Sequence, residues 1–295
     1  MEGARAHPAY EVAVVGHRGF LGGAIARHFE REGIAVRGFG RNDAVHAAGE
    51  PVPELERVST LVWCAGRANP RLAHEDPALA AADVEELREA LDVLRLLPSP
   101  PRIVLLSSGG TVYGPPAKPP FRETDAPSPV NAYGRAKLAQ EAALAQWPGG
   151  AVALRVSNAY GPGQVAAPGQ GVVAHWIAAA RAGEAITLYG DPGSTRDYIF
   201  VDDLARAVAA VHRHVGELPP VINIGSGTAT TLDALLSSFR EAIAPVSVTA
   251  VGSQARATDA SHSVLDVSLA REALGWTPGV GLVDGIRAQW QAGRP

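Results

Sequence analysis

The feature that most constrains this chain is a glycine-rich turn placed directly after its first apolar segment. Glu11–Val15 has the length and composition of a buried strand, and Phe20–Glu32 carries apolar residues at helical spacing. The turn between them reads Gly16-His17-Arg18-Gly19-Phe20-Leu21-Gly22, with a glycine at every third position. The first glycine permits a tight turn, the second a close approach to the backbone, and the third close packing of helix on strand. The chain is therefore expected to begin with a strand–turn–helix unit.

Strands and helices continue to alternate after this unit. Further buried strands are predicted at Ala35–Phe39, Thr60–Ala65, Ile103–Ser107 and Val152–Val156, and helices at Ala78–Leu97 and Val130–Gln146. Such alternation is typical of a parallel sheet covered by helices on both faces. We expect an α/β fold with a Rossmann-type doubly wound parallel sheet. The segment 41–59 is short for another strand–helix–strand excursion, so this edge of the sheet should be trimmed.

Bulk composition restricts the partners of the chain. The 295 residues carry a formal net charge of -4, so neither nucleic acid nor an anionic membrane is expected as a partner. No apolar run has the length of a membrane span, and the charged N-terminus is unlike a signal peptide. We expect a cytoplasmic location. Cys64 is the single cysteine, and no cluster of His, Asp or Glu has metal-ligand spacing, so no metal site is predicted.

The helix behind the glycine turn is suited to bind a phosphate group. Its first N–H groups and its dipole both favour negative charge. This predicts a dinucleotide site at the turn, with contributions from the end of a neighbouring strand; a tight turn without a ligand is the alternative. The expected contacts are Gly16, Arg18, Gly19, Phe20, Leu21, Gly22, Ala65 and Gly66.

The end of the second strand bears on which dinucleotide is bound. NAD sites carry a carboxylate there for the ribose hydroxyls, but this chain has Gly40, followed by Arg41 and Asn42. Arg18 in the turn points to the same region. Two guanidinium groups suit a 2′-phosphate, since each charge-assisted hydrogen bond contributes about 1.5–3 kcal/mol. NADP(H) is therefore the preferred cofactor and NAD a possible one; in the alternative, Asp43 takes the acidic role and Arg41 is a solvated cation.

A tyrosine and a lysine four residues apart provide proton-transfer chemistry. Tyr133 and Lys137 share one face at the start of a helix that follows a central strand. The lysine cation is expected to lower the pKa of the phenol, and Lys137 can also hold the ribose of the nicotinamide. A hydroxyl from the end of the preceding strand should complete the catalytic set. Ser108 is the first choice and Thr111 the reserve; the alternative is a turn whose serines only cap backbone groups.

Together these motifs resemble the extended short-chain dehydrogenase/reductase family, in its branch of nucleotide-sugar epimerases, dehydratases and ketoreductases. The resemblance covers nearly the whole chain, and the order of the motifs is more specific than any one of them. The motifs are Gly16–Gly22, Ser107–Gly114, Tyr133–Lys137, Asn158–Gln164, Arg196–Leu204 and Leu274–Pro278.

The resemblance implies a substrate that carries a nucleotide diphosphate. The family's asparagine and arginine that contact this group correspond to Asn158 and Arg196, and Arg256 would flank the same pyrophosphate. An otherwise acidic chain needs such cations to bind two phosphates. In the alternative, Arg196 forms an ion pair with Asp197 or Asp202, and Arg256 has no role in binding.

The motifs also suggest a division of the chain. Residues 1–157 are expected to form the NAD(P)-binding Rossmann domain, with later segments at about 190–215 returning to it. Residues 158–295 are expected to form mainly a smaller C-terminal α/β lobe that binds the substrate. The resemblance further implies a homodimer formed through two packed helices.

Individual motifs separate the branches of the family. The string Gly16–Gly19 with Arg41 resembles NADPH-dependent reductases of GDP-4-keto-6-deoxy sugars. In those enzymes a cysteine for epimerisation follows the serine pair, and Gly109 stands in that place here. Dehydratases need an acidic pair, which Gly109 and Gly110 do not supply. Ser107–Gly114 otherwise resembles the UDP-hexose 4-epimerases.

Three functions follow from these features. The first is an NADPH-dependent 4-ketoreductase of a nucleotide-linked 4-keto-6-deoxyhexose, in which Tyr133 delivers the proton. The second is an NAD-dependent 4-epimerase of nucleotide hexoses, similar to UDP-glucose 4-epimerase. The third is a dinucleotide-binding sensor or scaffold without turnover, against which the Ser108, Tyr133 and Lys137 set argues.

Overall fold

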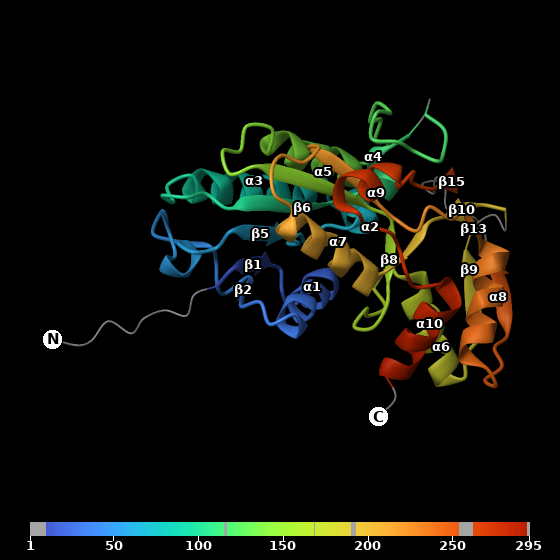
Figure 1. The fold of residues 1–295 in the computed structure, drawn as a ribbon. Coiled ribbons are helices and arrows are strands. Elements are labelled where there is room, and N and C mark those ends of the chain that lie inside the picture. The colour runs from blue at the N-terminus through green and yellow to red at the C-terminus, as the bar shows by residue number, and fades with distance from the viewer. Residues whose placement is uncertain (1–9, 115–116, 168, 190–192, 254–261, 294–295) are drawn as a thin grey trace.

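A six-stranded parallel sheet forms the centre of the molecule in a computed structural model, which describes residues 10–114, 117–167, 169–189, 193–253 and 262–293. Its strands follow the order β12-β7-β6-β5-β1-β2 (Figure 1). Each neighbouring pair is parallel. The bounds are β1 Val12–Val15, β2 Val36–Phe39, β5 Thr60–Trp63, β6 Arg102–Ser108, β7 Ala151–Val156 and β12 Val221–Ile224.

Helices cover both faces of this sheet. On one face α1 (Phe20–Arg31), α7 (Val201–Arg213) and α9 (Ser268–Leu274) contribute to one apolar cluster with the strands. On the other face α3 (Pro77–Leu94) packs on the strands in a second cluster, beside α5 (Ala132–Ala143). Figure 1 shows α3 and α5 side by side on one side of the strands and α1 on the other. The central strands are buried on both faces for this reason, which explains their unbroken apolar sequences.

The predicted α/β fold with a doubly wound sheet is confirmed, with shorter elements at several ends. The helix expected over Val130–Gln146 begins at Ala132, because the Asn131 side chain accepts a hydrogen bond from Gly134 N at 2.8 Å and caps the helix. The trimmed sheet edge is also confirmed. Beyond the edge strand β2, the chain forms a short hairpin of β3 (His46–Ala47) and β4 (Glu50–Pro51) and a 3₁₀ turn at Pro53–Leu55.

Two later segments lie with the large sheet. Helix α7, within the segment expected to return, packs on α1. Strand β12 lies beyond that segment and pairs with β7, so the sheet has a strand that the sequence pattern did not indicate. Its four residues are too few to show a period, and the buried Asn223 interrupts the apolar run.

The remaining elements form smaller sheets and a third apolar cluster. Figure 1 shows α6, α8 and α10 grouped near β9 at one end of the molecule, and their apolar side chains form this cluster. The elements are α6 Val172–Ala182, α8 Leu232–Ile243, α10 Leu282–Ala292, the pair β9 Ile186–Tyr189 and β14 Ala250–Ser253, the pair β8 Asn158–Tyr160 and β11 Tyr198–Phe200, and the sheet of β10 Thr195–Arg196, β13 Thr230–Thr231 and β15 His262–Ser263. Two short helices, α2 (Pro70–Glu75) and α4 (Gly109–Val112), follow β5 and β6.

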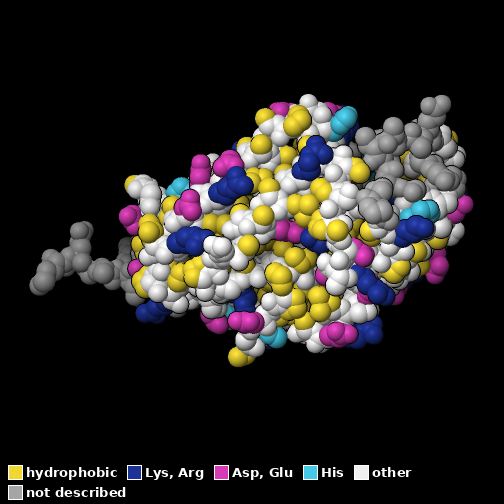
Figure 2. All heavy atoms as spheres, turned by 90° about the horizontal axis from the view of Figure 1, so that it is seen from above, with side chains coloured by type: hydrophobic (Ala, Val, Ile, Leu, Met, Phe, Trp, Pro, Cys, Tyr) yellow, Lys and Arg dark blue, Asp and Glu magenta, His cyan; other side chains and the backbone are white. Residues whose placement is uncertain are grey.

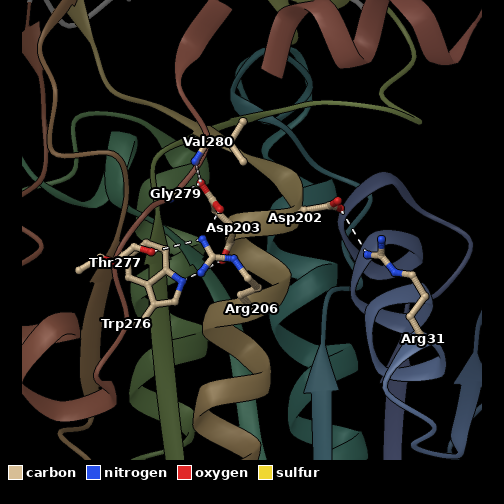
Figure 3. A network of polar contacts seen from close by, with 8 residues as sticks. All are labelled: Arg31, Asp202, Asp203, Arg206, Trp276, Thr277, Gly279 and Val280. Carbon is tan, nitrogen blue, oxygen red and sulfur yellow. Dashed lines mark hydrogen bonds and ion pairs between the residues drawn. The ribbon is translucent and has the colours of Figure 1, made fainter. Parts of the chain in front are cut away.

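A buried carboxylate attaches the segment after α9 to α7. Asp203 accepts hydrogen bonds from the backbone N–H groups of Gly279 and Val280, each at 2.9 Å, and pairs with Arg206 (Figure 3). Its carbonyl accepts a hydrogen bond from the indole of Trp276 at 3.0 Å. The acidic end of the Arg196–Leu204 motif is therefore structural in this fold, because Asp203 is fully engaged in fastening the chain.

The surface seen in Figure 2 carries basic and acidic side chains interspersed with apolar ones. Charges of one sign do not gather into a continuous stripe on this face. Within the described ranges, no helix is both long enough and apolar enough to span a bilayer.

Candidate active site

The glycine turn brings the end of β1, the start of α1 and the end of β5 together. Gly16 has φ +87°, a conformation that favours glycine, and a Cβ there would lie 3.0 Å from Ala65 N. A Cβ on Gly22 would lie 2.3 Å from the Gly16 carbonyl oxygen. The glycines are therefore needed for backbone contacts within the turn. Gly19, the N-cap of α1, provides no side chain to cap the helix, so the helix terminus stays open to a ligand.

The end of β2 lies against the same turn. His17 packs over Gly38, where a Cβ would come within 2.4 Å of the imidazole ring, and its Nδ1 is 2.9 Å from the Phe39 carbonyl oxygen. Next to it, Gly40 and Asp43 exchange two backbone hydrogen bonds of 2.9 Å. This closes a tight loop with Arg41 at its tip.

The charges around this loop are unequally partnered. Asp43 receives two hydrogen bonds from the Arg37 guanidinium, at 2.8 and 3.0 Å, and the pair raises the pKa of Arg37. Arg18 and Arg41 are exposed, and neither makes an ion pair or hydrogen bond with any described residue. The Asp43 carboxylate, the alternative group for binding the ribose hydroxyls, is thus neutralised by Arg37. The guanidinium groups of Arg18 and Arg41 remain available to a ligand. Asn42 is exposed next to Arg41.

The two hydroxyl candidates differ in their surroundings. Ser108 is half-buried at the end of β6, and its side chain does not cap α4. The Thr111 hydroxyl oxygen is enclosed and has no hydrogen-bond partner among the described residues. This geometry favours Ser108, whose hydroxyl is free to bind a ligand. A larger residue in place of Gly109 would require Leu265 to shift, because a Cβ would lie 2.5 Å from Leu265 Cδ1.

Tyr133 and Lys137 lie together in the first turns of α5. The Lys137 Nζ is 5.7 Å from the centre of the Tyr133 ring. Burial lowers the pKa of Lys137, opposed by the carboxylate of Asp83. Burial, together with Asp83, raises the pKa of Tyr133 to about 12. The expectation that Lys137 lowers the pKa of the phenol is therefore wrong for this structure, because desolvation of the phenolate and the charge of Asp83 both raise that pKa.

A buried ion pair and its hydrogen bonds join the elements that carry Ser108 and Lys137. Arg155 on β7 and Glu141 on α5 are 4% and 9% exposed and form a two-pronged pair, at 2.7 and 3.1 Å. Ser107 donates a 2.5 Å hydrogen bond to Glu141, and Arg155 donates to the Tyr113 hydroxyl at 2.9 Å. The network joins the strand that ends at Ser108 to the helix that carries Lys137.

Two residues beside Lys137 were absent from the predicted site. Asp83 on α3 and Gln140 on α5 are buried near the lysine. A carboxylate on the apolar face of α3, beside Ala80, Val84 and Leu87, was the available sequence signal.

The residues predicted to bind the substrate are only partly placed. Asn158 on β8 donates its amide to the Asp197 carbonyl at 2.9 Å, which brings it beside Arg196 on β10. The alternative ion pair of Arg196 with Asp197 or Asp202 is absent from the described ranges; Asp197 instead accepts hydrogen bonds from Ser226. Arg256 lies outside the described residues.

Comparison with known proteins gives the family. The NAD dependent epimerase/dehydratase family matches residues 12–225. The dTDP-6-deoxy-L-talose 4-dehydrogenase (NAD(P)(+)) of Kitasatospora kifunensis is 32% identical over 310 aligned positions, covering 95% of each chain. The dTDP-4-dehydro-6-deoxyglucose reductase of Escherichia coli is 36% identical over 190 positions, 63% of this chain and 59% of the relative. The UDP-glucose 4-epimerase of Thermus thermophilus, solved in complex with NAD, has a TM-score of 0.77 at 28% identity, covering 95% of this chain and 98% of that structure.

Fold, site and relatives together define an enzyme of the extended short-chain dehydrogenase/reductase type, which confirms the resemblance read from the motifs. This chain belongs to the NAD dependent epimerase/dehydratase family. The prediction of an NAD(P)-dependent enzyme is confirmed with it.

Proposed function

We propose that the chain is an NADPH-dependent 4-ketoreductase of a nucleotide-linked 4-keto-6-deoxyhexose. The observation that carries the cofactor choice is the pattern of charge at the end of β2. Arg18 and Arg41 are exposed and unpaired among the described residues, while Arg37 neutralises Asp43. A 2′-phosphate would bind the free cations, whereas the ribose hydroxyls of NAD would find no free carboxylate there.

The open glycine turn fits a dinucleotide. Gly16, Gly19 and Gly22 keep side chains out of the helix terminus, where backbone N–H groups and the helix dipole favour a pyrophosphate. Ala65 and Gly66 would line the neighbouring wall, and Lys137 would hold a ribose hydroxyl. When bound, the dinucleotide supplies the hydride for reduction of the carbonyl.

The environment of Tyr133 favours reduction as the direction of reaction. Burial and Asp83 raise its pKa to about 12, so the phenol is protonated near neutral pH and can donate to the oxygen of a reduced carbonyl. Ser108 would donate a hydrogen bond to the same oxygen. Arg196, and Asn158, whose amide donates to the carbonyl of Asp197 next to Arg196, would bind the diphosphate of the substrate.

Two relatives support the substrate class. The names of the Kitasatospora and Escherichia coli proteins describe redox chemistry at position 4 of dTDP-linked deoxysugars. The direct test is to follow NADPH oxidation at 340 nm with a dTDP-4-keto-6-deoxyhexose, and to compare the dissociation constants of NADPH and NADH. We expect substrate-dependent oxidation and tighter binding of NADPH; a clear preference for NADH would contradict the cofactor assignment.

A 4-epimerase of nucleotide hexoses is the second candidate. Likeness to the Thermus thermophilus UDP-glucose 4-epimerase solved with NAD favours it. That reaction keeps its cofactor bound through oxidation and re-reduction of the sugar. NAD that co-purifies with the protein, together with interconversion of UDP-glucose and UDP-galactose without added cofactor, would support this function against the first.

The same proposal assigns cofactor binding and substrate binding to two parts of the chain and includes the oligomeric state. Residues 1–157, with α7, would bind the dinucleotide, and most of 158–295 would bind the sugar nucleotide. A homodimer would form through α3 and α5, which pack against each other on one face of the sheet. Light scattering coupled to gel filtration tests this: a mass near twice 30.6 kDa is expected.

A further inference from the structure

The ammonium of Lys137 is held by two acceptors in the described part of the chain. Its Nζ donates to the Leu106 carbonyl of β6 at 3.1 Å and to Gln140 Oε1 at 3.0 Å. An ammonium has three N–H donors, so one remains for a ligand. Gln140 is 1% exposed, and its Nε2 donates to the backbone carbonyl of Asp83 at 2.9 Å. The glutamine therefore links Lys137 to α3.

The carboxylate of Asp83 turns toward the segment after β5. Both of its oxygens accept the backbone N–H of Arg67 at 2.9 Å, and one also accepts that of Ala68 at 3.0 Å. Gly66 lies against it, since a Cβ there would be 3.3 Å from Asp83 Oδ2. Asp83 makes no ion pair with any described residue and is 8% exposed. Neutral donors stabilise its charge without cancelling it.

Three titratable groups act on Lys137 from the elements packed around it. They are Asp83 on α3, Cys64 after β5 and Glu141 on α5. Asp83 has the largest effect of the three in raising the pKa of Lys137, against the lowering effect of burial. The charge of Glu141 is compensated by Arg155 at 2.7 Å. Of these three groups, Asp83 is the buried carboxylate that forms no ion pair with a described residue.

We propose that Gln140 and Asp83 are positioning residues of the active site: Gln140 aims the Lys137 ammonium, and Asp83 supplies the negative charge that keeps it an ammonium. This inference rests on the proposed function, in which Lys137 holds a ribose hydroxyl of the dinucleotide. It assigns a task to two buried polar side chains that lie next to Lys137 in the sequence of hydrogen bonds from α5 to α3. Their removal should weaken binding of the dinucleotide and slow turnover.

The composition of the chain allows a direct measurement. Lys118 and Lys137 are its only lysines, so selective ¹³C-lysine labelling gives two Cε signals, and Lys118→Arg assigns them. We expect Asp83→Asn and Gln140→Leu to move the titration of Lys137 to lower pH. Asp92→Asn is the matched control, because it removes an equal charge from an exposed site on α3. It should leave the titration of Lys137 in place.

Kinetics provide the second measurement. Both variants should raise the KM of the dinucleotide by about tenfold, because a misplaced ammonium no longer holds the ribose hydroxyl, and should lower kcat as well, because hydride transfer depends on that placement. An unchanged Lys137 titration in both variants, or an equal shift in Asp92→Asn, would overturn the inference. If Asp83→Asn does not fold, the titration of Gln140→Leu decides. A shifted titration in a protein that reduces no keto sugar would instead count against the proposed function.

Discussion

The two ends of the candidate active site differ in how their polar groups are satisfied. In the glycine turn and at the end of β2, Arg18 and Arg41 are exposed and have no partner among the described residues. At the catalytic end, the Glu141–Arg155 pair is buried and joined to its neighbours by short hydrogen bonds. The first region is an open set of charges that a ligand would complete, and the second is pre-organised by the fold. Mutations should therefore change binding at one end and chemistry or stability at the other.

The largest effect should come from the proposed proton donor, Tyr133. Tyr133→Phe is expected to lower kcat by about 10²–10⁴-fold, the contribution usual for a positioned acid or base. NADPH affinity, measured by fluorescence, should change little, because the phenyl ring keeps its packing. Tyr10→Phe is the control: it removes a hydroxyl from a tyrosine remote from Tyr133 in the sequence and should keep full activity. A Tyr133→Phe enzyme with normal kcat would remove the basis of the catalytic assignment.

The second prediction removes the buried ion pair between Glu141 and Arg155. Glu141→Gln leaves Arg155 buried without a carboxylate, which should lower the free energy of unfolding by about 3–5 kcal/mol in urea titrations. The control is Glu85→Gln, whose pair with Arg88 is exposed; exposed pairs contribute about 0–1 kcal/mol. Equal losses in the two variants would show that the buried pair is not a special support of the site.

At the end of the site that carries Arg18 and Arg41, mutations should weaken cofactor binding and leave stability nearly unchanged. Arg18→Ala and Arg41→Ala should each weaken NADPH binding by about 1.5–3 kcal/mol, the contribution of one charge-assisted hydrogen bond. NADH binding should stay the same, and the free energy of unfolding should change by no more than about 0.5 kcal/mol. Arg57→Ala, another exposed arginine, controls for net charge. A parallel loss of NADH affinity would contradict a 2′-phosphate site.

The smallest expected change concerns pH. Because burial and Asp83 raise the pKa of Tyr133 to about 12, its phenol keeps the proton well above neutrality and loses it only as pH approaches that value. The kcat of reduction should then vary by less than about twofold between about pH 6 and 9. A steep alkaline decline near neutral pH, present in wild type and absent in a variant with another proton donor, would show that the phenol ionises early.

Much of the fold and part of the site were accessible from the sequence. The glycine turn, the alternating strands and helices and the motif at Tyr133 and Lys137 are local patterns, and each appears where it was expected. Strand β12 was missed because its four residues form no period and its place depends on pairing with β7. The predicted lowering of the Tyr133 pKa is wrong, since burial depends on packing that spacing alone does not describe.

The sequence by itself determined the order of the elements, the glycine-rich turn and the family, because these depend on residues that are neighbours in the chain. Only the tertiary structure decided which charges remain free and which are neutralised. The Asp43 carboxylate is paired with the Arg37 guanidinium. The Lys137 ammonium donates to Gln140, which in turn donates to the backbone carbonyl of Asp83. Electrostatic partnership depends on distances of a few ångström between segments that are remote in sequence, and folding alone sets those distances.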